Sequence, residues 1–202
     1  MLPRASAFVL LAAVALAGCD ASSPFMRPVV PSRPVEPRAD AATVVFIRPS
    51  GYARTDKFPI FDEQGRFVGE SLPTSQFAIL MPPGNHVFVA GGGENIGVLK
   101  VELGPSRTYY VEVAPRLGFT RPRVHLLAIG RHAASFEHLR EWLDETKQYA
   151  PLTEPGQAEW SLRKGEVTQM LLDANDTWAK LDGEARKEST LVLEDGIELK
   201  LW

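Results

Sequence analysis

Residues 81–113 read MPPGNHVFVAGGGENIGVLKVELGPSRTYYVEV, and their pattern decides the fold class. Lys100 and Glu102 alternate with Leu99, Val101 and Leu103. A period of two is typical of a β-strand with one buried face. The runs PPG, GGG and GPS separate the apolar segments and are turn signals. This stretch therefore predicts three successive strands joined by short connections.

The same pattern of strand-like runs separated by turn residues extends on both sides, from about residue 41 to residue 129. β-Branched and aromatic runs alternate with Gly, Pro, Asn and Ser, and Pro59 inside its run indicates an edge strand. Regular spacing of such runs is typical of an antiparallel β-sandwich or barrel. We expect a mainly β protein built on an antiparallel β-sandwich of about seven or eight strands. The expected strands cover residues 42–48, 57–62, 66–70, 75–81, 85–91, 97–103, 107–113 and 123–129.

Three motifs carry a resemblance to known bacterial domains: ATVVFIRP (42–49), MPPGNHVFVA (81–90) and LGPSRTYYVEV (103–113). The region from about 41 to 130 resembles the DUF2846-like group of bacterial lipoprotein domains and, more loosely, the PEGA-type sandwich modules. The resemblance implies a β-sandwich of unknown function and brings no catalytic residues with it.

After residue 131 the pattern changes to helical spacing. SFEHLREWLDETKQY (135–149) predicts one amphipathic helix, with Ser135 as its N-cap, and Pro151 and the Pro155-Gly156 pair are expected to break it. EVTQMLLDANDTWAKL (166–181) predicts a second. The tail TLVLEDGIELKLW (190–202) is consistent with either a terminal hairpin or an irregular docked segment. We therefore expect a β-sandwich domain over 41–131 and a helical C-terminal arm over 132–202.

The first eighteen residues have the organisation of a secretory signal peptide. Arg4 precedes an apolar run that ends in small residues and is too short for a membrane span, which needs roughly 20 residues. Leu16-Ala17-Gly18-Cys19 resembles the lipobox of bacterial lipoproteins. That resemblance implies cleavage before Cys19 and acylation of its thiol and its new amino group. The alternative is an ordinary cleavage site with a cysteine beside it by chance.

Residues 19–40 are expected to form a lipidated cysteine followed by a tether. Pro28, Pro31, Pro34 and Pro37 recur every third residue, the period of polyproline II. Such a segment spans roughly 60 Å at ~3.1 Å per residue. A proline-rich ligand for an aromatic groove is the alternative. Asp20 resembles the inner-membrane retention signal of enteric lipoproteins, so the sequence favours the periplasmic face of the inner membrane over the outer membrane.

The GGG run is the first candidate binding loop. Gly91, Gly92 and Gly93 resemble a phosphate-cradling loop, but the spacing of a dinucleotide fingerprint fails at Ile96. We expect a flexible connection between strands in which glycine supplies positive φ angles. Contact with a ligand is the alternative.

The second candidate loop lies in APRLGFTRPRVH (114–125). Arg116, Arg121 and Arg123 surround Phe119, and the planar guanidinium group suits carboxylate or phosphate. An anionic headgroup, an acidic glycan and the acidic arm are candidate partners for this loop. A merely solvated loop is the alternative.

Composition excludes several classes of function. Cys19 is the only cysteine, so the chain can form no internal disulfide and no thiolate metal site. The formal net charge of −3 does not suggest a nucleic-acid-binding protein. No zincin, nucleophile-elbow or β-lactamase motif is present, and we expect no metal and no cofactor.

These observations predict a non-enzymatic, lipid-anchored protein of the cell envelope. It would present a β-sandwich to a partner protein or an envelope polymer. The first alternative is a small-ligand or lipid-binding envelope domain that uses the GGG loop or a cavity. The weaker alternative is an envelope hydrolase, because catalytic triads are defined in space and not in sequence.

Overall fold

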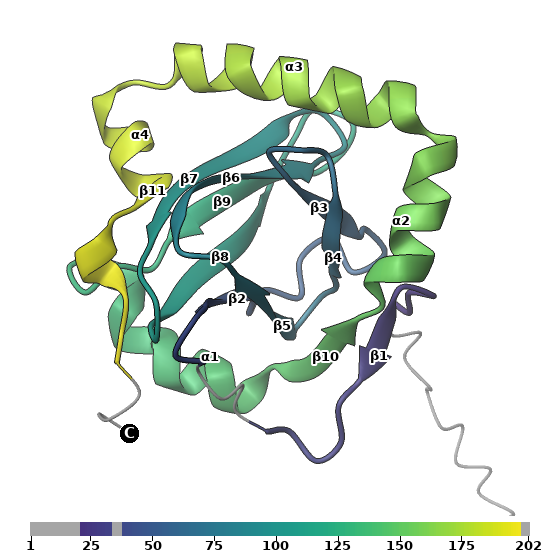
Figure 1. Cartoon of the computed structure of the whole chain (residues 1–202). Helices are drawn as coiled ribbons and strands as arrows, with labels where there is room; N and C mark the ends of the chain where they lie inside the picture. The colour runs from purple at the N-terminus through teal and green to yellow at the C-terminus, as the bar shows by residue number, and fades with distance from the viewer. Residues whose placement is uncertain (1–20, 34–37, 199–202) are drawn as a thin grey trace, which may run out of the picture.

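The computed structural model describes residues 21–33 and 38–198. Within these residues the protein is mainly β, with eleven strands in two sheets and four α-helices around them (Figure 1). No helix of the described residues is long and apolar enough to cross a membrane.

Six strands form sheet A and five form sheet B. Sheet A has the order β1 (Met26–Pro28), β10 (Lys147–Pro151), β5 (Ser75–Met81), β2 (Ala42–Arg48), β8 (Thr108–Arg116), β9 (Arg123–Ala128). Sheet B has the order β11 (Thr190–Leu191), β7 (Ile96–Leu103), β6 (Gly84–Gly91), β3 (Phe58–Asp62), β4 (Phe67–Ser71).

The sheets are mixed, so the prediction of a purely antiparallel fold is wrong. β2 is antiparallel to β5 but parallel to β8. β10 and β11, which come from the C-terminal region, pair in parallel with β5 and β7. Parallel pairing needs a long connection between the partners, and here the chain passes through the other sheet or through helices before it returns.

The two sheets enclose one core, which makes the fold sandwich-like. Alternating residues of each strand point inward, so that Phe46 and Phe77 of sheet A stack at 5.1 Å between ring centroids. Phe88 of sheet B meets Phe46 edge-on at 5.2 Å. In β7 the inward-facing residues, Leu99, Val101 and Leu103, are those that the period-two pattern of the sequence indicates.

Helices cover the outer faces of both sheets (Figure 1). The short η1 (Ala134–His138) and α1 (Leu139–Glu145) pack through Leu139 against Val45 and Tyr110 of sheet A. The helices α2 (Thr153–Leu162) and α3 (Lys164–Lys180) cover sheet B, where Val167 packs on Phe61. The C-terminal region is therefore packed onto the sheets, and α3 confirms the second predicted helix.

The first predicted helix is wrong beyond residue 145. Lys147–Pro151 forms β10, because this segment fills the position between β1 and β5 in sheet A. Pro155 and Gly156 do not break a helix but lie in the first turn of α2. A proline there loses no helical hydrogen bond, since the first N–H groups of a helix have no partner within it.

The tail docks instead of forming a hairpin within the described residues. After α4 (Gly183–Glu188), β11 joins sheet B and η2 (Leu193–Asp195) follows. Ile197 then exchanges backbone hydrogen bonds of 2.9 and 3.0 Å with Thr108. Of the two alternatives for this tail, the structure shows the docked one.

Part of the expected tether belongs to the fold. Met26–Pro28 is strand β1, which pairs with Tyr149–Pro151 of β10. The Met26 side chain is 4% exposed and reaches the core. The structure therefore differs from the expectation of a spacer that runs unattached to residue 40. Pro34 and Pro37 lie outside the described residues.

One buried charge stands out in the core. Arg48, the last residue of β2, is 0% exposed and stacks over the Phe58 ring at 4.8 Å. Its guanidinium group donates hydrogen bonds to the carbonyl oxygens of Tyr52, Ala53 and Asp56 at 2.7–2.8 Å. Burial lowers the pKa of Arg48 to about 10, so the group stays charged at neutral pH. This single side chain fixes the connection between β2 and β3.

Candidate functional site

The structure brings the two candidate loops of the sequence together. The β6–β7 loop contains the GGG run, and the β8–β9 loop contains the arginines and Phe119. Gly93 donates a backbone hydrogen bond to the Pro122 carbonyl at 3.0 Å. Asn95 pairs with the backbone of Val124, donating to its oxygen and accepting from its nitrogen, both at 2.8 Å. The two loops thus form one unit at the corner where the sheets meet.

Glu94 is the centre of this unit. Its carboxylate accepts hydrogen bonds from the backbone nitrogens of Phe119 and Arg121 at 2.7 and 2.8 Å, and from both the nitrogen and the hydroxyl of Thr120. Arg123 adds an ion-pair contact of 3.7 Å. The backbone hydrogen bonds, that of Thr120 first, lower the pKa of Glu94 to about 2. The loop amides that could have cradled an anion are therefore already occupied by a carboxylate of the chain.

Close approach, and not positive φ, explains the glycines. None of Gly91, Gly92 and Gly93 has a positive φ, so that expectation is wrong. A Cβ on Gly93 would lie 2.5 Å from the Arg121 Cβ. The glycines allow the two loops to touch, and a ligand needs the same space.

The β8–β9 loop nevertheless presents an exposed tip. Leu117 is 81% exposed and Phe119 is 95% exposed. Arg116 and Arg121 are exposed beside them, whereas Arg123 faces Glu94. The tip is therefore apolar, basic and held in shape from beneath.

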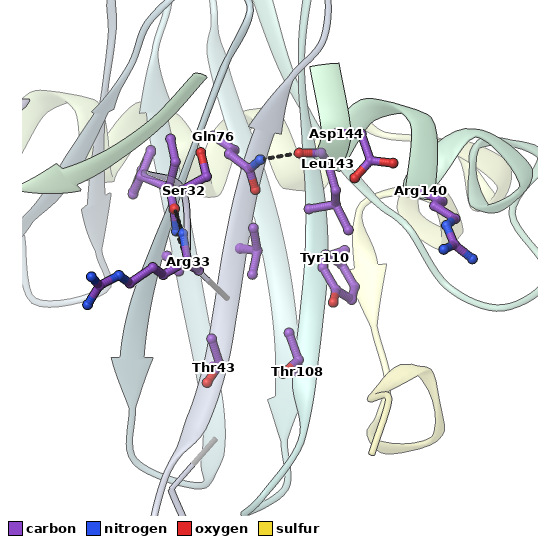
Figure 2. A pocket seen from close by; sticks show the side chains of 13 residues that line it. Ser32, Arg33, Thr43, Gln76, Thr108, Tyr110, Arg140, Leu143 and Asp144 are labelled. Atoms are coloured by element: carbon purple, nitrogen blue, oxygen red, sulfur yellow. Dashed lines mark hydrogen bonds between the residues drawn. The ribbon is translucent and has the colours of Figure 1, made fainter. Parts of the chain in front are cut away.

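A pocket of about 400 Å³ lies elsewhere, on the outer face of sheet A (Figure 2). Thr43 and Val45 of β2, Ala78 of β5 and Thr108 of β8 contribute to its lining. α1 borders it through Leu143 and Asp144, and the N-terminal segment borders it through Ser32 and Arg33. A volume of this size is within the range of small-molecule sites.

Two glutamines hold the walls of this pocket. The Gln76 side chain donates to the Leu143 carbonyl at 2.7 Å and so ties the end of α1 to β5. The Gln148 side chain exchanges two hydrogen bonds of 2.6 Å with the backbone of Arg33. Both walls are therefore fixed to strands of sheet A. In Figure 2 the Arg140 guanidinium group points away from the pocket, so its charge does not define the lining.

One end of the pocket holds buried hydroxyl groups. Thr43 and Thr108 are partners across β2 and β8 and lie side by side (Figure 2). They are 0% and 4% exposed, and neither hydroxyl has a hydrogen-bond partner among the described residues. Tyr110, two residues along the same face of β8, brings a third hydroxyl, and burial raises its pKa. This arrangement can accept or donate neutral hydrogen bonds and offers no acid–base pair.

Sequence reasoning missed this pocket. Its residues come from the N-terminal segment, from strands β2, β5, β8 and β10, and from α1, and none of these segments carries a local signature. The one available signal is that Thr43, Thr108 and Tyr110 place hydroxyl groups on the strand face opposite the core.

The structure does not place the predicted lipidation and sorting residues. Cys19 and Asp20 lie outside the described residues. Among the residues that are described, no group of three or more His, Cys, Asp or Glu side chains is placed to hold a metal ion. Comparison with protein-family models, with curated proteins and with solved structures finds no match. The resemblance to DUF2846-like domains therefore stays a prediction.

Proposed function

We propose that this chain is a lipid-anchored, non-enzymatic protein of the bacterial cell envelope that binds a small amphipathic molecule in the outer pocket of sheet A. The observation that carries the proposal is the pair of buried hydroxyl groups, Thr43 and Thr108, at the end of a pocket with fixed walls. A buried polar group without a partner costs about 1–3 kcal/mol. Both hydroxyl oxygens are inaccessible to solvent in this conformation, so a ligand recovers that cost by hydrogen-bonding them once side chains at this end of the pocket shift to admit it.

The pocket also indicates the chemistry of the ligand. Val45, Ala78 and Leu143 supply apolar walls, and the hydroxyl groups at the other end are uncharged. A neutral molecule with an apolar body and a hydroxyl or ester group at one end matches both features. A monoacylglycerol has this chemistry and serves as the probe.

The proposed anchor is Cys19, on the resemblance of Leu16–Cys19 to a lipobox. Because Met26 is already in sheet A, a fully extended chain reaches at most roughly 25 Å from Cys19 to the fold. The domain is then held close to the bilayer, and the retention signal proposed at Asp20 favours the inner membrane. Cys19→Ala should abolish metabolic acyl labelling, with Asp20→Ser as the matched control that keeps the label. A Cys19→Ala variant that is still labelled removes the anchor from the proposal.

Two variants test the pocket. Ala78→Trp fills it, and it should weaken binding of a medium-chain monoacylglycerol in calorimetry at least tenfold. Thr108→Val removes a hydroxyl without changing the shape, and it should weaken binding several-fold while stability rises by about 1 kcal/mol. Leu162→Ala, an exposed site on α2, should change neither quantity. Equal binding by the wild type and Ala78→Trp overturns the assignment of the pocket.

A second candidate function is that the domain binds a partner protein or an envelope polymer. Exposed Leu117 and Phe119 on the β8–β9 loop favour it, because large apolar side chains at a loop tip indicate contact with another surface. A crosslinker placed at residue 117 in cells tests it. Recovery of no protein or polymer adduct counts against this candidate.

A further inference from the structure

We infer that the β8–β9 loop tip is a membrane-contact site, in which Leu117 and Phe119 enter the interfacial region of an anionic phospholipid leaflet. This goes beyond ligand binding in the pocket, and it concerns a different part of the molecule.

The β8–β9 loop tip places two highly exposed apolar side chains unusually close together. Other large apolar side chains are exposed singly, such as Val30 at 89% and Leu162 at 83%. Only at this loop do two of the most exposed ones, Leu117 and Phe119, lie within three residues among the residues described. Burying Phe119 alone in an apolar environment contributes about 1.5–3 kcal/mol, which corresponds to roughly a ten- to hundredfold gain in affinity.

The shape of the tip is fixed before any contact. Glu94 accepts backbone hydrogen bonds from Phe119, Thr120 and Arg121. Gly118 permits the tight turn, since a Cβ there would lie 2.6 Å from a Glu94 carboxylate oxygen. A preformed loop has little conformational entropy to lose on binding. Glu94 is therefore a positioning residue for the tip.

The charge around the tip selects an anionic surface. Arg116 and Arg121 are exposed at its base, and the ion pair of Arg123 uses the carboxylate of Glu94. The neighbouring β2–β3 loop adds exposed Arg54 and Lys57. Basic side chains near an anionic leaflet are attracted within about one Debye length, ~8–10 Å. An apolar tip with arginines at its base matches a leaflet whose acyl chains lie beneath a layer of anionic headgroups.

The register of sheet A places this tip at the same end of the fold as Ala21, the first described residue. Arg48 pairs with Ser75 and Ser75 with Lys147, so β2 ends where β5 and β10 begin. β8 runs parallel to β2, and its loop leaves at this same end. Ala21 lies there too, since it lines a small pocket with Gly51, Thr74 and Lys147. The alignment of tip and anchor rests on the lipid anchor proposed above, whereas membrane contact by the tip does not.

A bilayer fits the tip better than a protein partner does. Specific protein interfaces bury on the order of 1,200–2,000 Å². Two protruding side chains on one turn fall far short of that area, and Glu94 already occupies the backbone donors beneath them. Interfacial insertion needs only a small apolar tip together with cationic side chains.

A single-cysteine experiment tests the inference in the full chain. Cys19→Ser removes the only thiol and with it any acylation. Leu117→Cys and, as a control, Leu162→Cys then accept the same environment-sensitive nitrobenzoxadiazole dye. The probes are phosphatidylcholine vesicles with and without phosphatidylglycerol. Because the N-terminal segment is identical in both proteins, any membrane binding by that segment affects them equally.

We expect a blue shift and quenching by chain-brominated lipid for the dye at 117 and not at 162, on phosphatidylglycerol vesicles only. Phe119→Ser should weaken vesicle binding roughly tenfold or more with an unchanged melting curve. An identical response at 117 and 162, or an equal response on neutral vesicles, overturns the inference. Acyl labelling of Cys19 is measured separately, so failure of the anchor and failure of the tip give different results.

Discussion

Replacing Arg48 by methionine removes the buried cation that fixes the β2–β3 loop. The change deletes the charge-assisted hydrogen bonds to the carbonyl oxygens of Tyr52, Ala53 and Asp56, together with a longer one of 3.4 Å to Ser71, and keeps most of the apolar stem. The three short bonds contribute about 1.5–3 kcal/mol each, or roughly 4.5–9 kcal/mol together. Desolvation of the guanidinium group costs several kcal/mol and offsets part of this sum. We expect a net loss of about 2–4 kcal/mol.

Urea unfolding followed by tryptophan fluorescence measures this loss directly. The matched control is Arg163→Met, because Arg163 is half exposed in an ion pair with Glu159 on α2, and we expect it to cost at most about 0.5 kcal/mol. A loss below about 1 kcal/mol for Arg48→Met refutes the reasoning. In that case water must replace the guanidinium donors without penalty.

Three further predictions concern the loops and the helices. The lowered pKa of Glu94 means that its contribution to loop order is fully present above about pH 4.5, the ordinary value, and is lost as the pH falls toward about 2. The protection factor of the Arg121 amide, that is, the intrinsic exchange rate at each pH divided by the observed rate, should fall over that window, and equal protection factors at both ends of the window contradict the assignment. Gly118→Ala should loosen the same loop, because its Cβ would lie 1.8 Å from the Arg121 carbonyl oxygen; unchanged exchange rates contradict this. Gly156→Ala should lower stability by about 1–3 kcal/mol despite the higher helix propensity of alanine, since the new Cβ would lie 2.2 Å from a Phe67 ring carbon. A stabilised variant contradicts that contact.

The strand positions could be predicted because their signal is local. The runs at 42–48 and 75–81 match β2 and β5 in their bounds, since apolar runs that end at Pro and Gly turn signals are a local mark of strands. The pairing could not be predicted in this way. Whether β2 lies parallel to β8 depends on contacts between residues such as Thr43 and Thr108, which are far apart in the chain.

Tertiary context explains the errors in the C-terminal region. Lys147–Pro151 continues a helical pattern but becomes a strand, because the edge of β5 is open there and strand pairing satisfies its backbone. A sequence rule that treats Pro and Gly as helix breakers predicts a break at Pro155 and Gly156, because it considers one segment alone. In the structure Gly156 is required by the neighbouring Phe67 ring of β4.

In the candidate loops, too, the sequence marks single residues but not the contacts between residues that are distant in the chain. The sequence marks Gly93 and Phe119 as candidate loop residues, but the residue that joins their loops is Glu94, whose partners lie 25–27 positions away. No local pattern marks that pairing. The pocket depends still more on topology, because its walls are set by the side chains of Gln76 and Gln148, each bonded to a segment distant in sequence.

Calorimetric titration of a medium-chain monoacylglycerol into the wild-type chain and into Ala78→Trp tests the central claim most directly. The account predicts one-to-one binding by the wild type and binding at least tenfold weaker in the variant, with both proteins folded to the same extent. Equal affinities in the two proteins, or no binding to the wild type, contradict it.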